Sequence, residues 1–570
     1  MEHFGAVVIG SGFGGSVSAY RFAERGLRVC VLERGAAHPP GTFPRAPHRF
    51  ARAFWDPSAG LYGMFNVWFF RHIAAVVASG LGGGSLVYGN VLLRKDERWF
   101  VRDDLASGGY EHWPIGREDL EEHYANVEQI LVPQRYPSGD GYANVKISAF
   151  REAARRVAAR APGKYTVEEL PLGIHFGQSA GAPFSEEHAN RYNAARRTCT
   201  LCGECSMGCN VGAKNTLDLT YLSRAEKLSA TIRTSAEVRA FRPRRGGGFE
   251  VDYVVHDLAR EGRPFDTSVL APTTITCDRL VLAAGSLGTS YLLLKNMGAF
   301  PAMSRAHVGT RFSGNGDMLA VALLATKRVD DRVEPWAIDS SMGPPITHAL
   351  RRADAVDTGD PRDGRGFYLE DSGIATPLMW MIEGLSTPGW IARGWRFARR
   401  VLWKLVGRDH DTDLGSELAD FLGPMALSSR SMPLLGMGRD VPDGRFSLDR
   451  DRLQLDWSKR RSSAFFDELT DAARAVAEEL GAQFKIDPLS DLFGRTITVH
   501  PLGGAPMGRN RHEGVTDSHG RVFGHPGLAI IDGSILPGSV GANPSLTIAA
   551  IADRASLALA SWAPGGAWPS

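Results

Sequence analysis

The sequence predicts an α/β protein with a Rossmann-like nucleotide-binding domain and a second, α+β domain built on an antiparallel sheet. A glycine-rich turn links an apolar run to an apolar helix over residues 6–23, and a second strand–turn–helix pattern occupies residues 281–294. Residues 300–490 contain few glycine motifs, and their apolar runs at 316–329 and 444–457 are typical of strands in a separate sheet. The 570 residues are enough for two such domains.

The composition is that of an ordinary globular protein. Apolar residues make up 43% and charged residues 22%, and the net charge of +2 does not indicate a nucleic-acid partner. No apolar run reaches the roughly 18 residues of a membrane helix. The first apolar run, residues 4–9, lacks the flanks of a signal peptide, so we expect a cytoplasmic location.

The N-terminal segment has every part of a nucleotide-binding βαβ unit. A strand at residues 6–9 leads into Gly10, Gly12 and Gly15, and a helix continues through Ala23. In such a unit the first glycine makes the turn, the second lets a pyrophosphate approach, and the third lets helix and strand pack. The next strand ends at Glu33, where an acid suits the hydroxyls of an unphosphorylated ribose. This motif by itself does not distinguish FAD from NAD.

Four further motifs stand far apart along the chain. They are SGLGGGSLVYGNV at 79–91, VLAAGSLGTSYLLL at 281–294, VHPLGGAPMG at 499–508 and IDGSILPGSVGANPSLTI at 531–548. Together with the βαβ unit they resemble the glucose–methanol–choline (GMC) family of FAD oxidoreductases, and within it the cholesterol oxidase branch. The resemblance runs from residue 5 to about residue 556 and implies FAD as the cofactor.

The resemblance also implies a division of the chain and a set of cofactor contacts. Residues 1–47, 75–95, 220–310 and 495–562 would form the FAD-binding domain, and residues 48–74, 96–219 and 311–494 the substrate domain. The implied FAD contacts are Gly10, Gly12, Gly15, Glu33, Gly84, Gly89, Asn90, Val91, Val238, Asp532, Gly533 and Ser545. Tyr88 departs from the family pattern, which often has Asn or His there beside the flavin.

Two residues near the C-terminus are candidates for the chemistry. His500 lies between a strand-like run and a glycine turn, and Asn543 precedes a helix that has Pro544 in its first turn. Taken alone, His500 is better explained as a histidine with its hydrogen bonds satisfied in a loop, and Asn543 is equally explained as a helix N-cap. The resemblance implies that both face the substrate hydroxyl beside the flavin. His500 would take the proton of the alcohol, and Asn543 would orient the hydroxyl.

Cholesterol oxidases also use a carboxylate that shifts a double bond. Glu370 is the best match, and Glu383 is the reserve candidate. The sequence around both departs from the family pattern, so an ordinary surface or capping carboxylate remains the alternative. A buried glutamate with a raised pKa would be required for this role.

A predicted helical lid at residues 378–408 contains four tryptophans. From Gly384 to Arg408 it has six Lys or Arg residues and no acid. A basic amphipathic helix of this kind can lie on an anionic membrane surface, although an ordinary helix packed on its own domain would show the same periodicity. A second aromatic stretch, residues 54–70, could line the same entrance. Both stretches suit a bulky lipid better than a sugar.

Four of the six cysteines lie in one loop, residues 199–209, with C-x2-C-x2-C-x3-C spacing. Cys199, Cys202 and Cys205 are spaced to bind an iron–sulfur cluster, with Cys209 as a fourth ligand or a bystander. Zinc and unliganded structural thiols are the alternatives. The two other cysteines, Cys30 and Cys277, lie in apolar strand-like runs and are expected to be inert.

The sequence therefore predicts FAD-dependent oxidation of a secondary alcohol on a bulky, sterol-like substrate, with double-bond isomerisation if Glu370 takes part. The alternative is a dehydrogenase of another apolar alcohol that passes electrons through an iron–sulfur centre to a carrier instead of to oxygen. A flavin- or lipid-binding protein without turnover is disfavoured, because His500 and Asn543 are both present.

Overall fold

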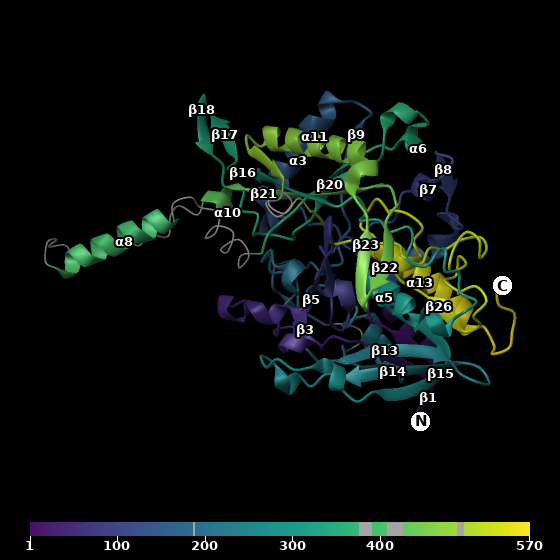
Figure 1. The fold of residues 1–570 in the computed structure, drawn as a ribbon. Helices are drawn as coiled ribbons and strands as arrows, with labels where there is room; N and C mark the ends of the chain where they lie inside the picture. Colours follow the sequence, from purple (N-terminus) through teal and green to yellow (C-terminus); the bar gives the residue numbers. More distant parts are fainter. Residues whose placement is uncertain (186–188, 376–389, 407–425, 487–494, 570) are drawn as a thin grey trace.

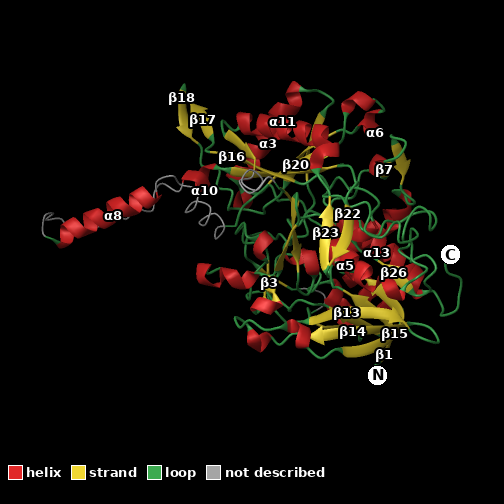
Figure 2. Cartoon of the chain, viewed as in Figure 1, coloured by secondary structure: helices red, strands yellow, loops and turns green. Residues whose placement is uncertain are grey.

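The computed structural model describes residues 1–185, 189–375, 390–406, 426–486 and 495–569 (Figures 1 and 2). Its N-terminal sheet follows the order β12–β2–β1–β15–β14–β13, and β26 also pairs with β15. These strands are β1 (His3–Ile9), β2 (Val29–Leu32), β12 (Thr231–Arg233), β13 (Ala236–Pro243), β14 (Phe249–Val255), β15 (Thr273–Leu282) and β26 (Leu528–Ile530). The pairs β1–β2, β1–β15, β2–β12 and β15–β26 are parallel, whereas β13, β14 and β15 pair antiparallel.

Helices pack against this sheet and bury its central strands. Helix α1 (Phe13–Glu24) follows β1 directly and packs against α13 (Ser545–Ala560), and α5 (Gly285–Asn296) follows β15. All four residues of β2 are buried, as expected for a parallel strand covered on both faces. The predicted Rossmann-like domain is confirmed.

A second sheet has six strands in the order β24–β16–β21–β20–β19–β9, and every pair in it is antiparallel. Its strands are β9 (Tyr165–Glu169), β16 (Met318–Leu323), β19 (His348–Arg352), β20 (Phe367–Asp371), β21 (Met432–Gly438) and β24 (Gln483–Ile486). Helices α3 (Val145–Arg160) and α11 (Ser463–Glu479) pack together over it (Figure 1). The α+β fold with an antiparallel sheet is therefore confirmed.

A small third sheet joins segments that are far apart in the sequence. Strand β6 (Ile73–Ala78) pairs antiparallel with β5 (Phe65–Phe69) and parallel with β25 (Thr496–Thr498). The predicted domain boundary between residues 74 and 75 falls inside β6, so it would divide the β5–β6 hairpin. The remaining boundaries stay predictions.

Shorter elements complete the fold. They are β3 (Trp55–Asp56), β4 (Leu61–Tyr62), β7 (Val101–Asp103), β8 (Tyr110–His112), α2 (Glu121–Leu131), β10 (Pro183–Phe184), β11 (Arg196–Arg197), α4 (Tyr221–Lys227), β17 (Thr326–Val329), β18 (Arg332–Pro335), α6 (Ala355–Thr358), α10 (Ala426–Arg430), β22 (Arg445–Asp449) and β23 (Arg452–Asp456).

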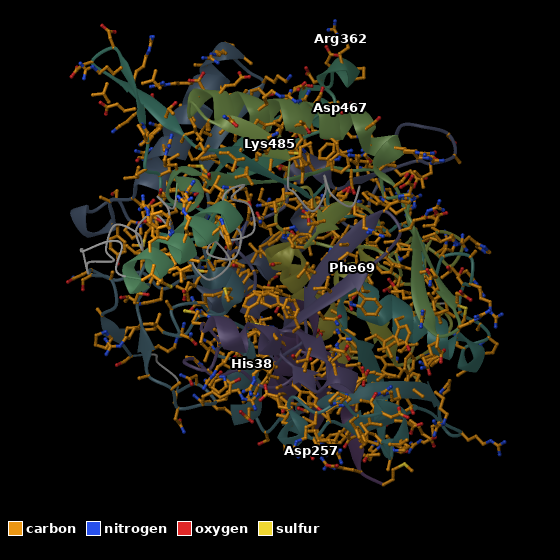
Figure 3. The ribbon with its side chains drawn as sticks, turned by 60° about the vertical axis from the view of Figure 1, so that its left-hand side comes forward. His38, Phe69, Asp257, Arg362, Asp467 and Lys485 are labelled. Atoms are coloured by element: carbon orange, nitrogen blue, oxygen red, sulfur yellow. The ribbon has the colours of Figure 1, made fainter. Side chains whose placement is uncertain are left out.

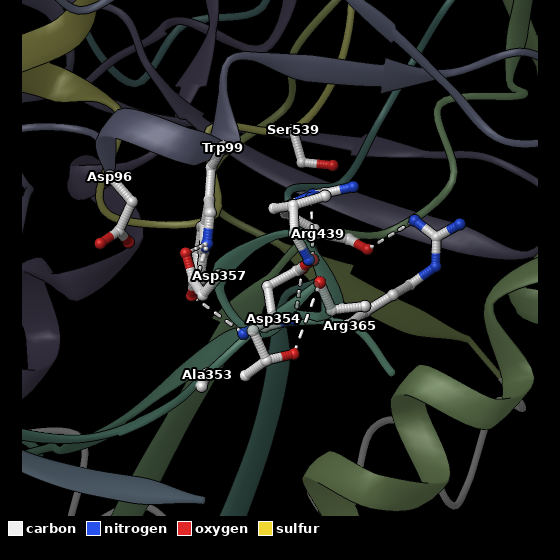
Figure 4. Close-up of polar contacts among 12 residues, drawn as sticks. Asp96, Trp99, Ala353, Asp354, Asp357, Arg365, Arg439 and Ser539 are labelled. Carbon is white, nitrogen blue, oxygen red and sulfur yellow. Dashed lines mark hydrogen bonds and ion pairs between the residues drawn. The ribbon is translucent and has the colours of Figure 1, made fainter. Parts of the chain in front are cut away.

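A buried polar network sets the position of β20. The Asp354 carboxylate caps α6, accepts a 2.6 Å hydrogen bond from the backbone amide of Gly366, and lies 3.0 Å from Nη1 of Arg439 (Figure 4). Gly366 directly precedes β20, and Arg439 directly follows β21. The ion pair therefore holds the adjacent ends of two neighbouring strands, which matters because β20 carries Glu370.

Helix α8 (Trp390–Leu405) extends away from the rest of the molecule (Figure 1). The side chains of Trp395 and Leu402 are 73% and 57% exposed. The rest of the predicted lid, including Glu383, lies outside the described residues. Within the described part of the chain, no helix combines the length and apolar character needed to cross a bilayer.

Candidate active site

A single cavity of about 990 Å³ touches both main sheets. One part of its lining consists of the glycine motifs, including Gly10, Gly12 and Gly84. Another part is apolar and includes Leu319 on β16 and Leu435 on β21. His500 and Asn543 also line this cavity, so residues far apart in sequence surround one space.

The nucleotide part of the cavity has room where a cofactor needs it. A Cβ atom added to Gly12 or Gly84 would meet no atom within 4 Å, although both residues line the cavity. At Gly15, by contrast, an added Cβ would lie 2.1 Å from the carbonyl oxygen of Gly10. Gly12 is also the N-cap of α1, so the free amides of the first turn lie at this space and suit phosphate groups. These glycines fit FAD in the roles that the motif predicts.

Glu33 is buried at the end of β2 and lines the same cavity. Its Oε2 atom accepts hydrogen bonds from the backbone amide (3.1 Å) and the hydroxyl group (2.6 Å) of Ser11, and Oε1 accepts from the amide of Gly35 (2.8 Å). Burial raises the pKa of Glu33 above its usual value, and these bonds oppose that shift. Two carboxylate oxygens accept about four hydrogen bonds, so one site remains for a ribose hydroxyl.

The structure brings most of the predicted cofactor contacts together. Those that line the cavity are Gly10, Gly12, Glu33, Gly84, Gly89, Val238, Gly533 and Ser545. Gly15, Asn90, Val91 and Asp532 are not part of the lining. Oδ2 of Asp532 instead accepts from the Gly285 amide at 2.9 Å and from the Thr289 hydroxyl at 2.5 Å, which holds the start of α5 against the cavity. Tyr88 lines the cavity with its ring edge-on to Phe13.

His500 is held by an aspartate that the sequence analysis did not identify. Nδ1 of His500 lies 2.9 Å from Oδ1 of Asp317, which directly precedes β16. Asp317 is buried and also lines the cavity. The only signal in the sequence was an acid in front of an apolar strand, and that pattern is too common to single out a residue.

Asn543 does not serve as a helix cap. The N-cap of α13 is Pro544, and its side chain makes no capping hydrogen bond. Instead, Nδ2 of Asn543 donates a long hydrogen bond of 3.5 Å to Oε2 of Glu370. Asn315 holds the loop in front of it, accepting from the Gly541 amide at 2.9 Å and donating to the Ala542 carbonyl at 3.0 Å. The capping alternative is therefore wrong, and the side chain is available to the cavity.

Glu370 is fully buried in β20, so the surface-carboxylate alternative is wrong as well. Burial raises its pKa well above the usual value, and the negative charges of Asp371 and Asp317 raise it further. Glu370 is not part of the cavity lining, but its Oε2 atom contacts Asn543, which is part of that lining. Its environment therefore disfavours the charged form of the carboxyl group.

The four loop cysteines surround a cavity of only about 10 Å³. Cys199 and Cys205 are buried, Cys209 is half-buried and Cys202 is exposed. Burial raises the pKa of the Cys205 thiol to about 12. Among the described residues, no three His, Cys, Asp or Glu side chains are arranged to hold a metal ion. The geometry therefore gives the predicted iron–sulfur cluster no support.

The cysteine loop is nevertheless attached to the cofactor part of the cavity. Nζ of Lys214 donates to the carbonyls of Leu86 (3.0 Å), Tyr88 (3.1 Å) and Cys205 (2.9 Å). Lys214 thus joins the loop to the backbone between Gly84 and Gly89. A structural role explains the position of this loop.

The aromatic stretch at 54–70 contributes to the lining as predicted. Phe65 and Trp68 on β5 line the cavity, whereas Phe69 is 66% exposed (Figure 3). With Leu319, Ile346 and Leu435 these rings make this part of the cavity apolar.

The fold and the site together define a flavoprotein oxidoreductase acting on CH–OH groups. The chain combines a Rossmann-like domain with an apolar cavity that joins its nucleotide motif, and a histidine and an asparagine lie on the cavity wall. Residues 446–552 match the family model described as GMC oxidoreductase, and residues 8–47 match that of an NAD(P)-binding Rossmann-like domain. The chain belongs to the GMC oxidoreductase family, as the resemblance in its motifs predicted.

Two relatives and one solved structure show how far the similarity extends. The chain is 30% identical to a cholesterol oxidase of Mycobacterium tuberculosis, covering 97% of this chain and 90% of that protein. It is 27% identical to a cholesterol oxidase of Acinetobacter baumannii, covering 96% and 93%. A formate oxidase from Aspergillus oryzae has the same fold, with a TM-score of 0.59, 13% identity and 98% coverage of each chain.

Proposed function

We propose that this protein oxidises the secondary alcohol of a bulky, sterol-like molecule with FAD as its cofactor. The observation that carries the proposal is the polarity of the cavity. His500 and Asn543 offer polar groups to a hydroxyl, whereas Leu319, Ile346 and Leu435 offer only apolar surface to the rest of the substrate. A sugar would leave its other hydroxyls without partners there. The cholesterol oxidase relatives support the same substrate class.

The residues take the following roles in this proposal. Asn543 orients the hydroxyl group of the alcohol, and the imidazole of His500 accepts its proton. When bound, FAD supplies the acceptor for the hydride that leaves the carbinol carbon. Ser545 marks the N-terminal end of α13 at the cavity wall, and the positive end of the helix dipole there stabilises negative charge.

Double-bond isomerisation is a further step within this proposal. If the new ketone has a double bond two carbons away, Glu370 would remove a proton from the carbon between them and return it to the far end of the double bond. The first transfer is made by the ionised form of Glu370, and the raised pKa makes that carboxylate a stronger base, which then returns the same proton as an acid. Because Glu370 reaches the cavity through Asn543, this step requires the asparagine side chain to turn aside.

We propose oxygen as the electron acceptor. The alternative, a dehydrogenase for another apolar alcohol, would need an iron–sulfur centre at Cys199, Cys202, Cys205 and Cys209. The small cavity among these thiols gives that route no support. Measuring hydrogen peroxide distinguishes the two acceptors. One molecule of peroxide forms for each molecule of alcohol oxidised only if oxygen receives the electrons.

We also propose a cytoplasmic enzyme that meets its substrate at a membrane surface through α8. Trp395 and Leu402 lie one above the other on one side of this helix and are exposed, whereas Arg396 and Arg399 add positive charge. An exposed apolar stripe flanked by arginines suits an anionic bilayer, where a sterol would be found.

Anaerobic mixing of the FAD-loaded enzyme with different alcohols tests the function. We expect a 3-hydroxysteroid to bleach the flavin absorbance faster than a long-chain primary alcohol, and glucose to have no effect. Product analysis then shows whether the ketone is isomerised. Bleaching by glucose alone, or by none of the alcohols, would overturn the proposed substrate class.

A further inference from the structure

We propose that Asp317 is a positioning residue that holds His500 in the tautomer with its proton on Nδ1, so that Nε2 accepts the proton of the alcohol. This inference deepens the proposed function and rests on it for the identity of the proton donor. Asp317 directly precedes β16 in the substrate sheet, whereas His500 follows β25. The contact between Asp317 and His500 therefore fixes the position of the catalytic histidine relative to the sheet that forms the apolar wall.

The carboxylate of Asp317 has a fixed orientation. Its Oδ2 atom accepts from the backbone amides of Val499 (2.8 Å) and His500 (3.0 Å) and lies 2.9 Å from the Thr498 hydroxyl. Backbone amides can only donate, so an acceptor must occupy this position. The other oxygen, Oδ1, then faces Nδ1 of His500 at 2.9 Å.

This arrangement decides the tautomer of the imidazole. An ionised carboxylate can only accept, so Nδ1 must carry the proton and Nε2 keeps its lone pair. His500 lines the cavity, and no group in the described part of the chain bonds Nε2. When the alcohol is oxidised, Nε2 of His500 would accept its hydroxyl proton, and the Asp317 carboxylate would stabilise the imidazolium ion that results.

The substitution Asp317→Asn should reverse the tautomer without changing the shape of the site. The two amides require the oxygen of the new amide group to face them, so its NH₂ group must face Nδ1. Nδ1 then has to accept, the proton moves to Nε2, and the base is lost. We expect flavin reduction by the alcohol to slow by about 10²–10⁴-fold, with FAD content unchanged.

Nitrogen NMR of the FAD-loaded protein with ¹⁵N-labelled histidine measures the tautomer directly. The His500 signals are assigned from their loss in His500→Gln. We expect protonated Nδ1 in the wild type and protonated Nε2 in Asp317→Asn. Thr498→Val is the matched control, because it removes a bond to the same carboxylate but keeps an acceptor facing Nδ1. It should retain the wild-type tautomer and slow reduction far less.

Several results would overturn the inference. One is an Nε2-protonated neutral His500 in the wild type, which decides the matter even if Asp317→Asn fails to fold. Others are an unchanged tautomer in Asp317→Asn, or equal losses of rate in Asp317→Asn and Thr498→Val. The tautomer is measured without substrate, so failure of every alcohol to reduce the flavin would overturn the proposed function and leave the tautomer result standing.

Discussion

Nδ2 of Asn543 lies 3.5 Å from Oε2 of Glu370, and both side chains are buried. Oδ1 of Asn543 and Oε1 of Glu370 have no hydrogen-bond partner among the described residues. A buried polar atom without a partner is costly, and such atoms are concentrated at sites that bind ligands. This contact links a carboxyl group with a raised pKa to the wall of the substrate cavity.

The raised pKa of Glu370 should make the protein lose stability as pH increases. Between the unfolded-state pKa and the higher folded-state pKa, the folded protein binds more protons than the unfolded chain, so the free energy of unfolding falls as pH rises. Glu370→Gln removes this proton binding and keeps the shape. Relative to the wild type, the melting temperature of the variant should therefore rise as the pH increases above the ordinary glutamate pKa of 4.5. The exposed Glu334→Gln is the control, and a constant difference for Glu370→Gln would contradict the assignment.

His500 should be needed for flavin reduction but not for flavin binding. Removing the positioned base in His500→Ala is expected to slow reduction by an alcohol by about 10²–10⁴-fold. The ratio of FAD to protein should stay at the wild-type value. Stopped-flow absorbance under anaerobic conditions measures the rate, and an unchanged rate would remove His500 from the active site.

Glu33 should strengthen FAD binding through one charge-assisted hydrogen bond. Glu33→Gln is expected to weaken FAD by about 1.5–3 kcal/mol, because the neutral amide accepts a weaker bond from the ribose. Equilibrium titration of the apoprotein with FAD, followed by flavin fluorescence, gives the two affinities. Equal affinities would mean that the carboxylate serves only Ser11 and Gly35.

Gly12 and Gly15 form a matched pair that separates cofactor binding from folding. A methyl group on Gly12 projects into free space of the cavity, so Gly12→Ala should weaken FAD binding and leave the melting temperature of the apoprotein unchanged. A methyl group on Gly15 would overlap the carbonyl oxygen of Gly10, so Gly15→Ala should destabilise the apoprotein itself. If Gly12→Ala binds FAD as the wild type does, FAD does not lie against this turn.

The cysteine loop should work without a metal. Protein purified anaerobically is expected to contain no stoichiometric iron or zinc, and Cys202→Ser should reduce and reoxidise its flavin as the wild type does. The reason is the small cavity of about 10 Å³ among the four thiols. Iron and acid-labile sulfide in whole-number ratios to FAD, lost in Cys202→Ser, would restore the dehydrogenase alternative.

Helix α8 should bind anionic vesicles more strongly than neutral ones. Co-sedimentation is expected to weaken as salt rises, because exposed charges are screened over about 8–10 Å near physiological ionic strength. Trp395→Ala and the double change Arg396→Gln with Arg399→Gln should each reduce binding. Arg362→Gln is the control, because this exposed arginine lies just after α6, on the opposite side of the molecule from α8 (Figure 1). Equal binding to both kinds of vesicle would contradict the membrane proposal.

Local patterns were sufficient to predict the nucleotide-binding part of this protein. The βαβ unit follows from glycine spacing and apolar periodicity within about 30 residues, because turn geometry and helix packing are decided by near neighbours. His500 and Asn543 were identified through the family resemblance of the motifs around them, because neither residue is distinctive by its local pattern alone. The antiparallel sheet followed from alternating runs, although the sequence did not reveal that the β5–β6 hairpin crosses the predicted boundary.

Only the tertiary structure decided what these residues contact. Asp317 and His500 are 183 positions apart, and Glu370 and Asn543 are 173 apart, so no local pattern connects them. The cysteine spacing suggested a cluster, but spacing along the chain does not determine burial or the room between thiols. Burial, distance and pKa arise when distant segments pack together. The sequence by itself therefore determined the fold class, the family and three catalytic candidates. Packing decided the aspartate behind the histidine and the raised pKa of Glu370.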